Sequence, residues 1–117
     1  MKMILLLFLF GISFISNSQT CSDLPTSFKS YNEAIKKIEN ANFKISESVN
    51  TSKSSWIRSS RYYSCEGKFG YLVFTTDTHK YVHKNVPIEI WNQFKVASSL
   101  GSYYNAYIKY KYQLIPE

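Results

Sequence analysis

The chain has 117 residues, with 14 Lys or Arg, 8 Asp or Glu and a formal net charge of +6. This length suits one domain with a modest core, and the four glycines form no phosphate-cradling loop. Residues 53–117 contain nine basic and four acidic side chains, whereas residues 21–52 are neutral. A basic second half is compatible with an acidic partner, although it also serves solubility.

The first 18 residues have the pattern of a cleaved signal peptide. A positive charge precedes an apolar run at residues 4–15, and the small residues Ser16 and Ser18 follow, as signal peptidases require. The run is shorter than the about 20 apolar residues of a membrane-spanning helix. We therefore expect residues 1–18 to be removed and the protein to be exported, either to the periplasm or as a secreted protein without a transmembrane anchor.

Two cysteines, Cys21 and Cys65, remain after export. In an oxidising compartment an even pair is more often bridged than free, so we expect a Cys21–Cys65 disulfide, with two free thiols as the alternative. Lipid attachment at Cys21 is disfavoured because the three residues before it lack the context of a lipoprotein signal. Isolated cysteines do not have the paired spacing of zinc ligands, and we expect no metal and no cofactor.

Residues 19–55 are predicted to contain an amphipathic helix followed by a polar linker. The apolar side chains that share one helical face, as in a helix that packs on a core, are Phe28, Tyr31, Ile35 and Ile38. Ser30 and Glu33 have the spacing of a capping box, although Thr26 or Ser27 could equally begin the helix. Residues 46–55 are rich in Ser and Thr without periodicity and predict a loop.

From Trp56 onward the pattern changes to β-structure. Residues 56–64, 68–76 and 79–83 are short runs separated by turn sequences, which predicts a three-stranded antiparallel meander. In the middle run, Tyr71 and Val73 face one way and the residues beside them face the other. Both faces are apolar, as expected of a central strand that is covered on two sides.

A second helix is predicted after Pro87, which suits the first helical position. Ser99 and Gly101 are predicted to form a structural turn that ends this helix, because glycine adopts the left-handed conformation of a C-terminal cap. Residues 102–107 are compatible with a helical turn. Residues 108–114 alternate between apolar and polar, as in a half-buried strand that packs Tyr110 and Tyr112 against the core.

Together these elements predict an α+β fold: an N-terminal amphipathic helix, a three-stranded antiparallel meander, a second helix and a short C-terminal strand or helical turn. The part from residue 56 to residue 114 resembles the KTSC domain, a small module named for its occurrence at the C-terminus of some lysyl-tRNA synthetases and also found as a stand-alone protein. The matching residues are Tyr62 or Tyr63, Leu72, Val73, Phe74, Tyr81, Asn85, Val86, Pro87, Trp91, Ala97, Ser99, Gly101, Tyr103, Tyr104, Asn105, Ile108 and Lys109.

This chain departs from the family pattern at one position, and the resemblance implies little about activity. Where the family has Tyr-x-Tyr, this chain has Tyr81-Val82-His83, so a role that needs a second phenol hydroxyl is in doubt. The family has no established biochemical function. RNA binding has been suggested from the synthetase context, and export fits poorly with an intracellular RNA role.

The sequence does not predict an enzyme. His79 and His83 are the only imidazoles, and Asp77 shares their strand face, but side chains spread along one strand do not converge as a catalytic triad or a metal site requires.

Aromatic and basic side chains of the third predicted strand and the C-terminal segment instead predict a recognition surface. The candidate binding residues are Tyr81, His83, Lys84, Tyr103, Tyr104, Asn105, Tyr107, Lys109 and Lys111. We expect a monomeric, non-enzymatic interaction module that binds an unidentified protein or another acidic partner, with nucleic acid as the alternative.

Overall fold

The computed structural model describes residues 19–117, so the predicted signal peptide lies outside the described residues. The elements in chain order are β1 (Gln19–Thr20), a 3-10 turn (Cys21–Asp23), α2 (Tyr31–Glu39), β2 (Ala41–Asn42), β3 (Ile45–Ser48), β4 (Ile57–Ser64), β5 (Phe69–Thr76), β6 (Lys80–Pro87), α3 (Ile88–Lys95) and α4 (Leu100–Tyr107). In residues 19–117, no helix has the length and apolar character that crossing a membrane requires.

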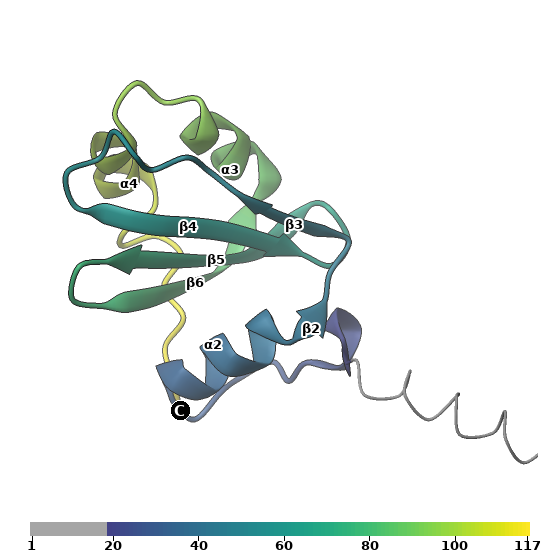
Figure 1. Cartoon of the computed structure of the whole chain (residues 1–117). Helices are drawn as coiled ribbons and strands as arrows, with labels where there is room; N and C mark the ends of the chain where they lie inside the picture. Colours follow the sequence, from purple (N-terminus) through teal and green to yellow (C-terminus); the bar gives the residue numbers. More distant parts are fainter. Residues whose placement is uncertain (1–18) are drawn as a thin grey trace, which may run out of the picture.

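The centre of the fold is an antiparallel sheet with the strand order β3-β4-β5-β6. Helices α3 and α4 lie on one face of this sheet and α2 lies on the other (Figure 1). The short strands β1 and β2 form a separate parallel pair at the start of the described chain. The predicted α+β class and the predicted meander are confirmed, because the three long strands β4, β5 and β6 follow one another as neighbours.

Each face of the sheet has its own hydrophobic core. On β5, Leu72 and Phe74 belong to the core beneath α3 and α4, whereas Val73 belongs to the core beneath α2. The prediction of a central strand covered on both faces is therefore confirmed. The first core contains Ile57, Tyr62, Leu72, Phe74, Val86, Trp91, Phe94, Tyr104 and Ile108. The second contains Phe28, Ala34, Ile35, Ile38, Tyr63, Val73, Val82 and Leu114.

The sheet has four strands, and the prediction of three was wrong. Ile45 and the first three residues of the predicted loop, 46–48, form the edge strand β3, which pairs antiparallel with residues 61–64 of β4. The polar side chains of β3 show no apolar alternation, so the sequence pattern did not predict a strand here. An edge strand is held by backbone pairing and tolerates charged residues. One of them, Glu47, accepts hydrogen bonds from the buried indole of Trp91 (2.7 Å) and from Lys95 (3.0 Å).

Ser99 and Gly101 begin a helix, and the prediction that they end one was also wrong. Helix α3 stops at Lys95, and the Ser99 side chain caps α4 by accepting a hydrogen bond from the Ser102 amide (3.2 Å). Gly101 lies in the first turn of α4, where the indole of Trp56 packs against it. A Cβ at this position would come within 2.8 Å of the Trp56 Nε1 atom, so the absence of a side chain at Gly101 allows the indole to pack this closely.

The segment after α4 covers the edge of the sheet without forming a strand. Residues 108–111 form turns, and the only pairing near the end of the described chain is an isolated bridge between His83 and Gln113. The amide of Lys84 donates to the carbonyl of Tyr112 (2.9 Å). The predicted C-terminal strand is therefore wrong, and Tyr110, which was expected to pack, is 74% exposed. The compatible helical turn at residues 102–107 falls within α4.

Residues 19–44, which we call the N-terminal layer, are attached to the sheet at several points. Cys21 and Cys65 form the predicted disulfide, with Cα atoms 5.7 Å apart, which joins the start of the layer to the end of β4. Ser30 caps α2 by accepting from the Glu33 amide (3.0 Å), as the capping-box spacing predicts. At the other end of the chain, the Glu117 amide donates to the carbonyl of Phe28 (2.9 Å), and Figure 1 shows the C-terminus beside α2.

Candidate functional site

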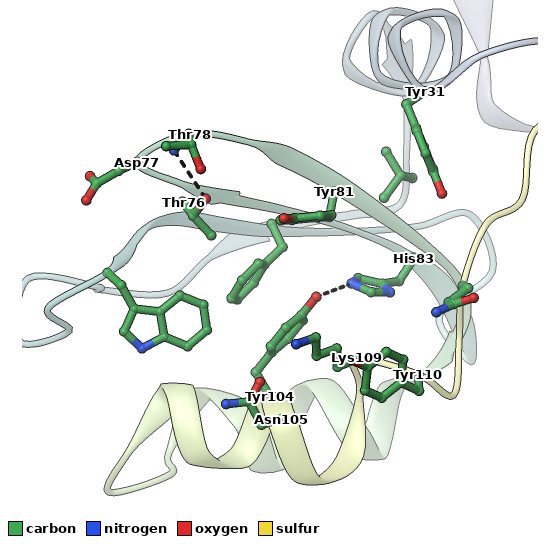
Figure 2. A pocket seen from close by; sticks show the side chains of 14 residues that line it. Tyr31, Thr76, Asp77, Thr78, Tyr81, His83, Tyr104, Asn105, Lys109 and Tyr110 are labelled. Carbon is green, nitrogen blue, oxygen red and sulfur yellow. Dashed lines mark hydrogen bonds between the residues drawn. The ribbon is translucent and has the colours of Figure 1, made fainter.

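A cleft of about 620 Å³ opens between the β5–β6 hairpin and α4. We call it the aromatic cleft, because most of its large side chains are aromatic. Figure 2 shows that its walls come from distant parts of the chain: Tyr31 from α2 on one side, and Lys109 and Tyr110 from the segment after α4 on the other. Its lining consists of Tyr31, Trp56, Phe74, Thr76, Asp77, Thr78, Tyr81, Val82, His83, Tyr104, Asn105, Lys109, Tyr110 and Gln113.

The floor of the aromatic cleft is a packed group of rings. Phe74 and Tyr104 stack with centroids 3.8 Å apart and planes inclined by 4°. Trp56 meets both rings edge-on, at 5.8 Å from Phe74 and 6.3 Å from Tyr104. Edge-on and stacked arrangements are favourable beyond the burial of area. The floor is thus a preformed apolar surface joining strands and helix.

His83 and Tyr104 form the polar contact beneath this floor. The Nε2 atom of His83 lies 2.8 Å from the hydroxyl of Tyr104, and both side chains are buried. Burial lowers the pKa of His83 to about 4 because the charged imidazolium would lose its hydration. The Tyr112 carbonyl partly opposes this shift but forms no well-aligned hydrogen bond to Nδ1. Burial also raises the pKa of the Tyr104 phenol. Both groups are therefore neutral near pH 7.

The rim of the aromatic cleft combines exposed rings with few charges. Tyr81 is 41% exposed and Tyr110 is 74% exposed, and the ammonium of Lys109 lies 5.1 Å from the Tyr110 ring centroid. Asp77 at the hairpin turn is paired with Arg58 (2.6 Å), which lowers the pKa of the carboxyl. The rim is thus aromatic with one cation that has no carboxylate partner within the described residues.

A second cleft, of about 550 Å³, lies on the other side of Trp56. We call it the serine cleft, and it is lined by Asn50, Ser52, Lys53, Ser54, Ser55, Trp56, Lys95, Ala97, Ser98, Ser99, Leu100, Gly101, Ser102 and Asn105. Trp56 and Asn105 line both clefts. The close contact of the indole with Gly101 fixes the wall between them.

The structure brings five of the nine predicted binding residues together. Tyr81, His83, Tyr104, Asn105 and Lys109 line the aromatic cleft. Their roles differ, since His83 and Tyr104 are buried in its floor whereas Tyr81, Asn105 and Lys109 are exposed.

The other four predicted residues lie outside this cleft. Tyr103 donates its hydroxyl hydrogen to Gln93 (2.9 Å) and packs on Tyr107, with centroids 4.6 Å apart. The ammonium of Lys111 lies 5.9 Å from the Tyr107 ring centroid. Lys84 is a half-buried residue of β6. The predicted face is therefore divided: Tyr103, Tyr107 and Lys111 gather at α4 outside the cleft, and Lys84 lies apart from them on β6.

Several residues of the site were missed by the sequence analysis. Trp56 was noted only as the start of a strand, and Tyr31 was assigned to the buried stripe of the first helix although it is 45% exposed. A tryptophan just before a strand gives no local indication of a cleft wall. Nothing in the sequence indicated that Tyr31 is exposed, because Tyr31 shares its helical face with apolar residues that are buried, Phe28, Ile35 and Ile38.

Comparison with known proteins identifies the family. The family model for the KTSC domain matches residues 53–112, which include β4, β5, β6, α3 and α4 but neither α2 nor β3. No curated protein and no solved structure matches the chain. The match covers more than half of the chain, so this protein belongs to the KTSC domain family.

Proposed function

We propose that this protein is an exported, non-enzymatic binding module that recognises a partner protein through the aromatic cleft. The observation that carries the proposal is the exposure of Tyr81 and Tyr110 at the mouth of a cleft with a packed aromatic floor. Aromatic side chains beside a pocket are the usual energetic centres of protein interfaces, because they bury a large apolar area and also carry a polar group.

The rigidity of the floor supports this proposal. Phe74 belongs to the central strand, and its ring is held between Tyr104 and Trp56. The hydrogen bond between Tyr104 and His83 attaches the Tyr104 ring to β6. A preorganised floor reduces the entropy lost when a partner binds. Only the rim residues would need to adjust.

The polar groups of the aromatic cleft favour binding over catalysis. His83 is buried, uncharged near neutral pH and already bonded to Tyr104, so it is poorly placed to accept a proton from a bound substrate. Asp77 is engaged by Arg58. The Lys109 ammonium packs on the Tyr110 ring. These arrangements suit the orientation of a ligand by a few polar contacts.

Export is supported by the disulfide and by the leader pattern. A disulfide persists in oxidising compartments outside the cytosol, and the pair Cys21–Cys65 joins the N-terminal layer to the domain. The pattern of residues 1–18 is that of a secretory leader. We infer the location from these two features together.

Single-stranded nucleic acid is the second candidate partner. It is favoured by the position of Lys109 beside Tyr110 at the mouth of the cleft, since aromatic rings and cations together stack on bases. However, Lys84 and Lys111 do not line this cleft. A continuous track of cations for a phosphate backbone is therefore less well supported than a protein interface.

The proposal is tested by comparing matched surface variants in capture and titration. The oxidised protein starting at Gln19 is immobilised, proteins of an envelope extract from the source cells are captured, and a purified captured protein is then titrated. We expect the double variant Tyr81→Ala/Tyr110→Ala to weaken its affinity by about tenfold or more, as for a lost interface centre.

The control variant is Tyr107→Ala. Tyr107 is 49% exposed, close to the exposure of Tyr81, but lies outside the aromatic cleft. Its replacement should leave the affinity unchanged. Equal affinities for the double variant and the control, or the absence of any protein retained above a blank surface, would contradict the proposal.

A further inference from the structure

The aromatic cleft and the serine cleft are neighbours that meet at Trp56. The indole and the side chain of Asn105 line both, and the clefts have similar sizes, about 620 and 550 Å³. A ligand larger than a single side chain that enters one of them therefore meets Trp56 and can continue into the other.

The two clefts differ in chemistry. The aromatic cleft offers ring faces from Trp56, Tyr81 and Tyr110, which suit an apolar or aromatic group. The serine cleft offers hydroxyl and amide groups from six serines and two asparagines, with Leu100 as its largest aliphatic side chain. A ligand that fills both must carry an apolar part and a polar part next to each other.

The charged side chains of the two clefts indicate which charge the polar part of the ligand carries. The charged side chains that line the serine cleft are Lys53 and Lys95, and no carboxylate lines it. Lys95 is paired with Glu47 (3.0 Å), whereas Lys53 has no ion-pair partner among residues 19–117. In the aromatic cleft, Lys109 likewise has no carboxylate partner in the described chain. Unpaired cations in both clefts complement a ligand with carboxylates.

We infer that the two clefts together bind one acidic peptide segment of the partner. An aromatic or large apolar side chain of the segment occupies the aromatic cleft, the chain crosses Trp56, and Asp or Glu side chains reach the serine cleft beside Lys53. This inference rests on the proposed function, which it deepens by naming the chemistry of the ligand.

A peptide fits this surface better than a nucleic acid does. A single strand that stacks on Trp56 and Tyr81 would need a row of cations for its phosphates, but each cleft supplies one lysine without a carboxylate partner, Lys53 and Lys109. A peptide needs one apolar anchor and a few carboxylates. The serine hydroxyls can also bond to peptide backbone groups.

The inference is tested by selecting short random peptides displayed on phage against the immobilised oxidised protein. We expect enriched peptides to combine an aromatic or large apolar residue with Asp or Glu a few positions away. A synthetic enriched peptide should lose about fivefold in affinity with Lys53→Gln at low salt, and its binding should weaken as salt screens the charge. Trp56→Phe should weaken it as well while keeping an aromatic ring in the wall.

The matched control is Lys68→Gln, because Lys68 is an exposed lysine that lines neither cleft. Enriched peptides without acidic residues, equal effects of the two lysine variants, or preferential binding of a fluorescent oligo-dT strand would overturn the inference. The first two outcomes would leave the proposed function intact if Tyr81→Ala/Tyr110→Ala still weakened binding of the captured protein. Normal binding by that double variant would contradict the proposed function itself.

Discussion

The imidazole Nε2 of His83 and the hydroxyl oxygen of Tyr104 lie 2.8 Å apart in the interior of the protein. This contact joins β6 to α4 across the floor of the aromatic cleft, and each side chain is 4% exposed. By the resemblance described in the sequence analysis, His83 stands where the family's Tyr-x-Tyr pattern has its second tyrosine. Here a histidine side chain provides the polar partner for Tyr104 and also introduces a titratable group into the core.

The first prediction concerns the pH dependence of folding. The pKa of His83 is about 4 in the folded protein and about 6.5 in an unfolded chain. As the pH falls from 6.5 to 4, the unfolded state binds a proton that the folded state does not bind, so the free energy of unfolding decreases by up to roughly 3 kcal/mol. Above pH 6.5 His83 is neutral in both states, so its protonation no longer lowers the free energy of unfolding. Urea denaturation at pH 7.0 and pH 4.5 measures the loss.

Two histidine variants isolate this effect. His83→Gln removes the titrating group, so its stability should depend less on pH across this window than that of the wild type, although it lowers the stability at pH 7. His79→Gln is the control, since His79 is exposed, where its ring contacts the hydroxyl of Thr78 (2.8 Å) and stacks on Tyr81 (centroids 5.7 Å apart). If both variants retained the pH dependence of the wild type, His83 would not be its source.

The fold was predictable where apolar patterns are strong. The alternation of Leu72, Val73 and Phe74 gave the central strand and its two covered faces. Apolar alternation did not reveal the strand that contains Glu47, because the polar edge strand β3 is held by backbone pairing and by the hydrogen bonds that Glu47 accepts from Trp91 and Lys95. It also failed at Tyr110, because turns at residues 108–111 break the two-residue period on which the predicted strand depended.

The second prediction tests the start of α4. Ser99→Ala removes the side chain that accepts a hydrogen bond from the Ser102 amide, and loss of an N-cap costs about 1 kcal/mol. Ser98→Ala is the control, because Ser98 is exposed and precedes the cap. Thermal denaturation should give a lower midpoint for Ser99→Ala only. Equal midpoints for the two variants would mean that the cap contributes little to the stability of the fold.

The third prediction tests how β3 is attached. Glu47→Ala leaves the nearly buried indole N–H of Trp91 without its acceptor, and an unsatisfied buried donor costs about 1–3 kcal/mol. The hydrogen bonds from Trp91 and Lys95 also lower the pKa of the Glu47 carboxyl, so the carboxylate is the accepting form at pH 7. Denaturation in urea should show a reduced free energy of unfolding.

Glu39→Ala provides the comparison for Glu47. Glu39 pairs with Lys80 at the surface (3.2 Å), and such exposed pairs contribute about 0–1 kcal/mol. The Glu47 variant should therefore be clearly less stable than the Glu39 variant. If the two were equally stable, water would be replacing the carboxylate at Trp91, and backbone pairing alone would hold β3.

The candidate site was only partly predictable, because it depends on how distant segments meet. The Tyr and Lys residues near the C-terminus indicated a binding surface, but the sequence did not show that Tyr103 turns toward Gln93 while Tyr104 turns toward His83. Both tyrosines belong to one short helix, and neighbouring residues on a helix point about 100° apart. Residues 102–107 were expected to be compatible with a helical turn, but the expectation that Ser99 ends a helix missed that Ser99 begins α4 and so sets the direction of both tyrosines.

The last prediction concerns the disulfide and the layer that it fastens. Replacing Cys21 and Cys65 by serine removes a link across 44 residues, which in the loop-entropy model lowers the free energy of unfolding by about 4 kcal/mol. The layer before β3 is attached to the sheet by α2, whose buried side chains are Ala34, Ile35 and Ile38. Hydrogen exchange should therefore accelerate in α2 more than in β5. Because α2 carries Tyr31 to the aromatic cleft, the reduced wild-type protein should also bind the captured partner more weakly than the oxidised protein does. Equal hydrogen-exchange rates in the oxidised protein and the double serine variant would mean that the apolar contacts of α2 alone hold the layer in place.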